Sequence, residues 1–199
     1  MRRDLLAQYA AVIALCTLSS ATTTAQETVP ELVRRHKGNV EFLVIREFSP
    51  VGLSELARDC DLIARVVVVD GRSHLSDDER EVQSEYTLQI IDSLLSRKTL
   101  TPAQNIIVTK PGGTLTIDGY QFTTRETDFP PFLTTDEYVL FLRFDARTGK
   151  YVVPYGAQGA FRHVAGVIEQ VGSGEWNTER RRVSLLDFIQ ELTAILTPR

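Results

Sequence analysis

Short apolar segments separated by turn signals run through most of this chain, and they restrict its fold more than any other feature. Residues 82–95 alternate between apolar and polar side chains, which is the period-two pattern of a half-buried strand. Many short strands predict a mainly β fold, and a five- or six-stranded, partly open barrel without a long exposed edge fits best. The strands are expected at residues 40–48, 62–69, 82–95, 105–110, 114–122, 138–144, 150–153, 159–163 and 167–171.

Two helices accompany these strands in the prediction. A short helix over residues 54–60, capped by Ser54, comes directly before the first barrel strand. A longer amphipathic helix is expected over residues 183–196, where Ser184 and Asp187 have the spacing of a helix cap. Amphipathic helices usually pack on their own domain, so we expect this one to cover the core.

The first 25 residues have the order of a cleavable signal peptide. Arg2 and Arg3 give a basic start, residues 9–18 are apolar, and a small-residue stretch ends at Ala25. The apolar run is too short to span a bilayer, which needs about 20 residues. We therefore expect a secreted or periplasmic protein. The arginine pair also allows twin-arginine export, so the choice between this route and ordinary export stays open.

The sequence predicts three regions, and cleavage after the first would leave one cysteine. Residues 1–25 form the signal peptide, residues 26–52 a polar N-terminal extension with a possible strand, and residues 53–199 the barrel domain with its C-terminal helix. Cys16 would leave with the signal, so Cys60 could form no intrachain disulfide. A domain exported to an oxidising compartment must then be held together by packing alone.

The charge of the chain argues against a nucleic-acid partner, and its hydropathy argues against a membrane-spanning segment after the signal peptide. The formal net charge is −4, whereas nucleic-acid-binding proteins usually carry a basic patch. The one basic run, residues 180–182, precedes the expected C-terminal helix and is interpreted as a solvated face, with contact to an anionic surface as the alternative. No integral membrane segment is expected after the signal peptide.

No catalytic, cofactor-binding or metal-ligating residue is predicted, and the binding residues remain unknown. No two histidines have the spacing of a metal motif, and no nucleophile elbow is present. Cys60 is interpreted as a buried structural cysteine. We expect a solvated loop at residues 77–79, and turns at residues 111–113 and 172–174. No catalytic or ligand role is expected for His36, His74, His163, Cys60, Asp77, Asp78, Glu79, Gly112 or Gly113.

Several segments resemble known families. Residues 60–66 (CDLIARV) resemble the opening of netrin-like domains, which include the tissue inhibitors of metalloproteases. Residues 85–95 (EYTLQIIDSLL) and 137–142 (EYVLFL) are similar to later strands of that family. Residues 111–113 (PGG) and 156–161 (GAQGAF) are similar to elements of uncharacterised secreted bacterial proteins.

The resemblance implies an oligonucleotide/oligosaccharide-binding (OB) type of barrel that is used for protein–protein contact. The inhibitors act through an N-terminal cysteine that chelates zinc, and this chain has no cysteine between residues 26 and 59. That mechanism is not carried over, and a fold alone does not fix function. We expect a secreted, non-enzymatic interaction module with an unknown protein partner. The alternatives are an extracytoplasmic hydrolase with a carboxylate pair, and a structural envelope component.

Overall fold

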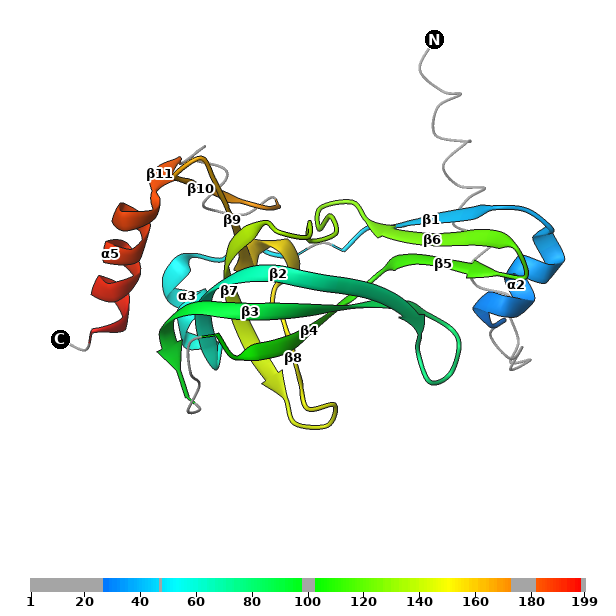
Figure 1. The fold of residues 1–199 in the computed structure, drawn as a ribbon, viewed down its shortest axis with the longest axis horizontal. Coiled ribbons are helices and arrows are strands. Elements are labelled where there is room, and N and C mark those ends of the chain that lie inside the picture. Colours follow the sequence, from blue (N-terminus) through cyan, green and yellow to red (C-terminus); the bar gives the residue numbers. More distant parts are fainter. Residues whose placement is uncertain (1–26, 47, 98–102, 173–181, 198–199) are drawn as a thin grey trace, which may run out of the picture.

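The structure, a computed structural model, describes residues 27–46, 48–97, 103–172 and 182–197 and is mainly β (Figure 1). Its helices are α2 (Val29–His36), α3 (Leu53–Arg58), α5 (Leu185–Leu196) and the 3-10 helix η1 (Gly156–Gly159). Its strands are β1 (Val40–Val44), β2 (Leu62–Leu75), β3 (Val82–Ser96), β4 (Asn105–Pro111), β5 (Gly113–Ile117), β6 (Tyr120–Glu126), β7 (Glu137–Asp145), β8 (Lys150–Val152), β9 (Ala160–Val164), β10 (Val167–Gln170) and β11 (Val183–Ser184).

Five strands of the larger sheet close into a ring. In this ring β7 pairs with β2, β2 with β3, and β3 with β4, all antiparallel. The parallel pair β4–β8 and the antiparallel pair β8–β7 complete the circle. The remaining strands β9, β10 and β11 extend the sheet outward from β7.

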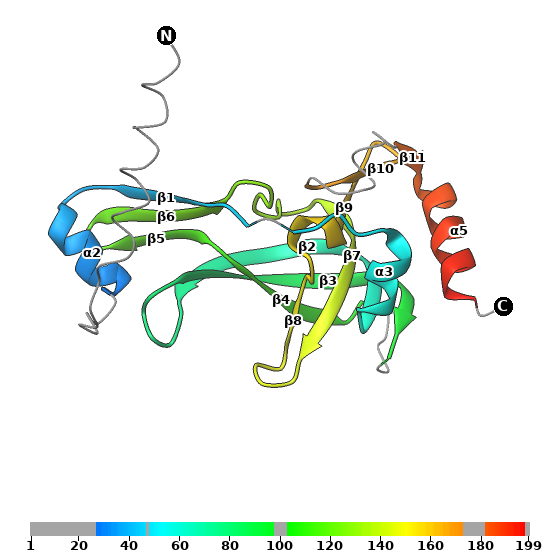
Figure 2. The same cartoon turned by 180° about the vertical axis from the view of Figure 1, so that it is seen from behind.

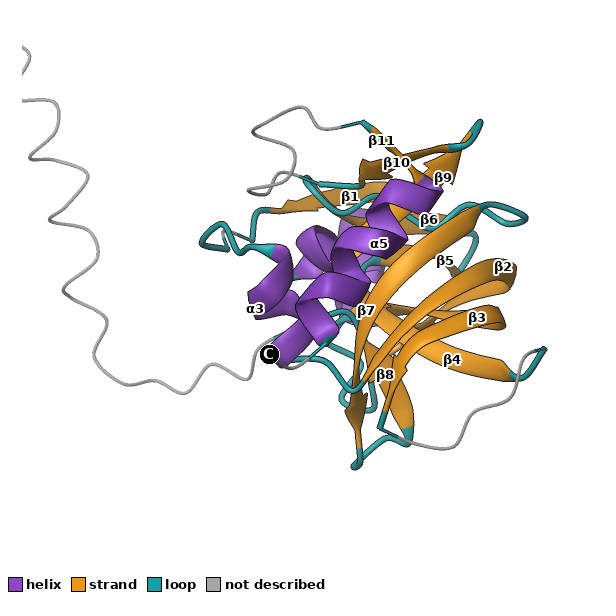
Figure 3. Cartoon of the chain, turned by 90° about the vertical axis from the view of Figure 1, so that its left-hand side faces the viewer, coloured by secondary structure: helices purple, strands orange, loops and turns teal. Residues whose placement is uncertain are grey.

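Three apolar cores hold the molecule together. Inward-facing residues such as Val66, Leu88 and Leu140 fill the ring. A second core lies between the helices α3 and α5 and the outward-facing residues of β2, β7 and β9, and Figure 3 shows the two helices side by side. A third, smaller core joins α2 to β6 around Val33 and Phe122.

A separate three-stranded sheet, in the order β1-β6-β5, projects from the ring with α2 at its far end (Figures 1 and 2). The chain passes from β4 in the ring to β5 in this sheet through Gly112, whose φ is +86°. The parallel pairing of β1 with β6 places β1 at an edge of the described sheet. This edge strand is five residues long.

The N-terminal extension is more regular than the sequence analysis predicted. Residues 26–39 contain α2, which begins with a capping box. Thr28 Oγ1 accepts a hydrogen bond from the Glu31 N–H at 3.4 Å, and Glu31 Oε2 accepts one from the Thr28 N–H at 2.9 Å. The strand predicted at residues 40–48 ends at Val44. The predicted signal peptide, residues 1–25, lies outside the described residues.

Two strand predictions were wrong in their boundaries. The strand expected at residues 62–69 does not end there, because β2 continues through Asp70 and Gly71 to Leu75, paired with β3. The single strand expected at residues 114–122 is a hairpin of β5 and β6, which turns at Asp118-Gly119 with positive φ at both residues. In addition, α3 is capped by Gly52, not Ser54.

The other strands end within one residue of their predicted bounds, and α5 begins two residues after the predicted start of the C-terminal helix. Ser184 caps α5, and its side chain accepts a hydrogen bond from the Asp187 N–H at 3.1 Å. Phe188 and Leu192 of this helix are fully buried. Within the described ranges, none of the helices combines the length and the apolar character needed to cross a bilayer.

Candidate binding cleft

A cleft lies where the three-stranded sheet meets the ring, and we call it the sheet-junction cleft. It consists of three adjoining cavities with volumes of about 270, 370 and 510 Å³. Glu126, the last residue of β6, and Phe129, in the loop that follows, line all three. The largest cavity also contacts Leu43 of β1. The cleft therefore joins the edge strand to the end of the ring.

Lys110 closes the end of the ring beneath this cleft. Its side chain is buried, and its Nζ donates hydrogen bonds to the carbonyl oxygens of Phe129 at 2.5 Å and Pro130 at 3.3 Å. The same Nζ lies 4.2 Å from the centroid of the Phe129 ring. Burial lowers the pKa of Lys110 to about 8, and the Glu126 carboxylate opposes this shift. Lys110 thus ties the loop to the ring.

The buried position of Lys110 predicts a rise in stability with pH. The folded-state pKa of about 8 lies below the ordinary lysine value, so between them the unfolded chain binds more protons and the free energy of unfolding rises. Relative to the variant Lys110→Met, wild type should gain about 1 kcal/mol between pH 7 and 9. Urea denaturation of both proteins at each pH measures this difference. Parallel pH profiles for the two proteins would contradict the prediction.

Glu126 is a nearly buried carboxylate that Arg46 holds in place. Its side chain is 7% exposed, and its Oε1 lies 2.8 Å from Nε of Arg46. The parallel register pairs Val44 with Glu126, which brings Arg46, two residues further on, alongside the carboxylate. Burial raises the pKa of Glu126, whereas the positive charges of Lys110 and Arg46 lower it.

Tyr155 forms one wall of the cleft in a conformation that is rare for a residue with a side chain. Its φ is +60°, and Gly156 follows with φ +57°. The Tyr155 hydroxyl donates a hydrogen bond to the Asp59 carboxylate at the end of α3. This bond is the main cause of a lowered pKa of Asp59. The ring of Phe48 lies so close to Gly156 that a Cβ there would meet it at 2.8 Å.

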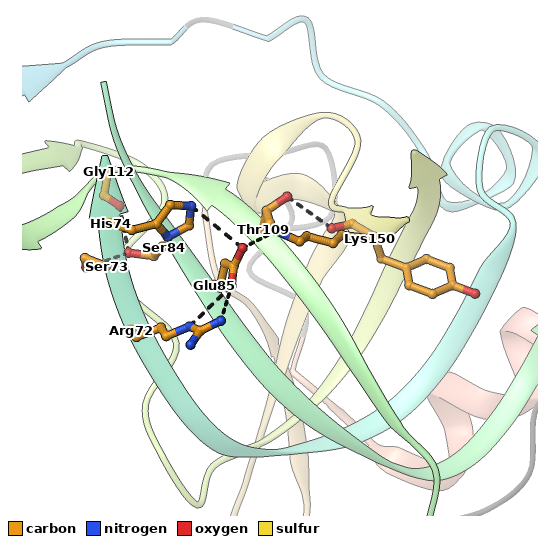
Figure 4. Close-up of polar contacts among 9 residues, drawn as sticks. Arg72, Ser73, His74, Ser84, Glu85, Thr109, Gly112 and Lys150 are labelled. Atoms are coloured by element: carbon orange, nitrogen blue, oxygen red, sulfur yellow. Dashed lines mark hydrogen bonds and ion pairs between the residues drawn. The ribbon is translucent and has the colours of Figure 1, made fainter. Parts of the chain in front are cut away.

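A second polar cluster lies on the outer face of the ring, around Glu85 (Figure 4). The Glu85 side chain is 7% exposed and is surrounded by Arg72 at 3.0 Å, the ammonium group of Lys150, and His74 at 3.7 Å. The hydrogen bond from Lys150 lowers the pKa of Glu85 most strongly, burial opposes this, and Arg72 lowers it further. These contacts link β2, β3 and β8, so we interpret the cluster as structural.

The structure separates the residues that the sequence analysis considered. The three histidines do not meet. His36 ends α2, His74 faces Glu85, and His163 Nδ1 lies 3.1 Å from Glu137 Oε1. Within the described ranges, no group of three potential ligand residues could hold a metal ion.

The remaining candidates also have structural positions. Cys60 is buried beyond the end of α3, and burial raises its thiol pKa to about 11. The hydroxyl of Ser76 donates to the Asp78 carboxylate at 2.7 Å, within an exposed turn. Of the basic run, Arg182 pairs with Glu169, and residues 180 and 181 lie outside the described residues. Of the turn predicted at residues 172–174, only Gly172 is described.

Sequence reasoning missed the cleft residues Arg46, Lys110, Glu126 and Tyr155. One signal was available, because Lys110 occupies an inward-facing position of a strand in which Ile106 and Val108 are apolar. A charged residue at such a position is rarely fully buried unless it has a specific partner. Arg46 and Glu126 gave no comparable signal, since they meet only through the pairing of distant strands.

Neither the known protein-family models nor the curated proteins contain a match to this chain.

Proposed function

We propose that this chain is an exported, non-enzymatic protein-interaction module, and that its partner adds an extended segment along the edge of β1. One observation carries this proposal. Four large apolar side chains are exposed within seven consecutive residues: Phe42 and Leu43 in β1 are 43% and 67% exposed, and Ile45 and Phe48, which follow β1, are 71% and 44% exposed. Large exposed apolar side chains that gather in one segment mark interaction sites, and soluble proteins usually protect sheet edges.

The position of β1 suits the addition of a strand. Main-chain hydrogen bonds along a free sheet edge supply affinity, and pockets for alternate side chains supply specificity. Successive side chains of β1 point to opposite faces, so Leu43 turns toward the largest cavity of the cleft while Phe42 packs against Phe122 at 5.5 Å between ring centroids. A partner strand on this edge would lie directly beside the cleft.

The ring supports an OB-type barrel as the scaffold of this module. Counting β2, β3, β4, β7 and β8 as strands one to five, the order around the ring is 1-2-3-5-4, with a parallel pair where strands three and five meet. A five-stranded Greek-key barrel is the architecture of that fold. In this proposal β5 and β6 form an insertion between the third and fourth barrel strands. β1, which precedes the first barrel strand, pairs with β6 and completes the three-stranded sheet.

Export follows from the basic, apolar and small-residue order of residues 1–25. The described domain suits an oxidising compartment, because Cys60 is buried and carries a pKa of about 11, so little reactive thiolate forms. We therefore place the module outside the cytoplasm, either secreted or in the periplasm.

The test replaces Leu43 in β1 and Ile45, the residue directly after β1, which are the two most exposed of the four side chains. Leu43→Lys together with Ile45→Lys should reduce partner binding at least about tenfold, because exposed apolar anchors become charged. The free energy of unfolding should change by less than about 0.5 kcal/mol, since both side chains are exposed. A photo-crosslinker at position 45 of the exported domain, incubated with the extracytoplasmic fraction of the source, should attach to one protein through an extended segment.

Leu186→Lys is the matched control, because Leu186 is 64% exposed on α5, away from the cleft. This variant should bind the partner like wild type. Equal capture by all variants, or crosslinks of the same intensity from positions 45 and 186, would refute the proposed edge.

A hydrolase is the second candidate, because Glu126 and Asp128 line the same 270 Å³ cavity beside aromatic residues. Burial raises the pKa of Glu126, as a general acid requires. Turnover of a glycoside or ester panel that Glu126→Gln abolishes, without any captured partner, would favour the hydrolase over the interaction module.

A further inference from the structure

The 270 Å³ cavity of the sheet-junction cleft has aromatic walls held from three directions. Phe48 follows β1, Phe129 lies in the loop after β6, and Tyr155 precedes η1. Each ring is fixed by a separate contact. Phe48 lies against Gly156, the Tyr155 hydroxyl is bound to Asp59, and the Phe129 ring lies below the ammonium of Lys110. Rings that are already in place lose little conformational entropy when a ligand binds.

Charge distinguishes this cavity from its neighbour. Two carboxylates, Glu126 and Asp128, line it with one cationic side chain, Arg46, so the lining residues carry a net charge of −1. The ammonium of Lys110 is not part of this lining and lies against the Phe129 ring. The adjoining 370 Å³ cavity has the opposite balance, with four cationic side chains against two carboxylates, namely Arg46, Lys110, Arg143 and Arg147 against Glu126 and Asp145. An anionic ligand would therefore prefer the larger neighbour, and a cation the smaller cavity.

We propose that the 270 Å³ cavity receives the cationic side chain of an arginine or lysine from the partner's extended segment. Aromatic faces attract cations through the ring quadrupole, and this effect grows when the cation is desolvated. The nearly buried Glu126 carboxylate adds a charge-assisted hydrogen bond. The cavity is smaller than the roughly 300–1,000 Å³ typical of small-molecule sites, so it suits one side chain.

This inference rests on the proposed function for the source of the cation, but the cavity can be tested alone. The probe is n-butylguanidinium, compared with the neutral n-butylurea, in an NMR titration of the exported domain. Only the cation should give saturable shifts, centred on the amides of Gly156, Ala157 and Gln158. Glu126→Gln should raise the dissociation constant about tenfold or more, because it removes the charge and keeps the shape.

Asp128→Asn is a second variant, and it leaves the buried groups of the cleft unchanged because Asp128 is exposed. It should weaken binding of n-butylguanidinium by about two- to fivefold, as expected for one partly screened charge. Asp118→Asn is the matched control, since Asp118 is a carboxylate at the β5–β6 turn that pairs with Arg34 instead. This control should bind like wild type.

Two results would overturn the cation pocket. One is equal shifts with n-butylguanidinium and n-butylurea, and the other is unchanged affinity in both Glu126→Gln and Asp128→Asn. If either result is obtained while capture of the partner protein still depends on Leu43 and Ile45, the cation-pocket proposal is refuted and the interaction-module proposal is retained. Selective binding of the cation, without any partner protein whose capture depends on Leu43 and Ile45, would support the cation pocket and refute the interaction module.

Discussion

Replacing Gly112 by alanine is expected to lower the free energy of unfolding by about 3 kcal/mol or more. The φ of +86° alone costs an alanine roughly 1–2 kcal/mol. In addition, a Cβ at this position would lie 2.8 Å from the carbonyl oxygen of Thr124, a backbone atom of the neighbouring strand β6. Because Thr124 is paired with Gly113 in the three-stranded sheet, it cannot move without shifting β6 and Glu126.

The hydrogen bonds around Gly112 explain why this connection between β4 and β5, which we call the Gly112 joint, cannot shift to accommodate a Cβ. The Gly112 N–H donates to the carbonyl of Val82 at 2.8 Å. The Gly112 carbonyl accepts a hydrogen bond from Ser84 Oγ at 2.7 Å (Figure 4). Ser73 Oγ lies 3.1 Å from Ser84 Oγ and accepts from the N–H of Thr114 at 3.2 Å. The joint is therefore fixed to β2 and β3 on one side and to β5 on the other.

Gly119→Ala is the matched control for Gly112→Ala. Its φ of +83° is nearly the same, but no atom lies within 4 Å of the added Cβ. Thermal and urea denaturation should therefore show a loss of only about 1–2 kcal/mol for this variant. If both variants lose the same stability, the close approach to Thr124 does not hold the joint as described.

The parts of the fold that local pattern determines were predictable. The alternation in β3 and the apolar run in β7 gave their positions, because each pattern reflects which faces of a strand are buried. The spacing of Ser184 and Asp187 predicted the start of α5, since a cap involves residues close in the chain. The capping box at Thr28 and Glu31 is an equally local signal that the sequence analysis overlooked.

The extension of β2 could not be predicted, because pairing with β3 outweighs a local turn signal. Asp70 and Gly71 usually form turns, yet here Gly71 lies opposite Tyr86 in the register. A Cβ on Gly71 would meet the Tyr86 ring at 2.9 Å, so the aromatic ring covers the space that a side chain would take. Such aromatic cover stabilises a glycine inside a strand.

The cleft residues could not be predicted from the sequence for a similar reason. Arg46 and Glu126 are 80 positions apart in the printed sequence and meet only because β1 pairs with β6 in parallel. Tyr155 and Asp59 belong to segments that no periodicity connects. No motif relates these residues, so their convergence depends on the topology of the sheets.

Replacing Phe188 by alanine should destabilise the chain by about 3–5 kcal/mol, the range for truncating a buried phenylalanine. Phe188 is fully buried on α5, and its ring centroid lies 4.9 Å from that of Phe161 on β9. The Phe161 ring in turn lies 5.6 Å from that of Phe141 on β7. The cavity left by Phe188 would border residues held by strand pairing, so it could collapse only in part.

Leu186→Ala is the control on the same helix, two residues away. Because Leu186 is 64% exposed, its truncation should change the free energy of unfolding by no more than about 0.5 kcal/mol. Urea denaturation of the two variants therefore measures directly whether α5 covers the core or stands free to bind a partner. A loss below about 1 kcal/mol for Phe188→Ala would show that α5 is not part of the core, and would move the search for the partner's binding surface from β1 to this helix.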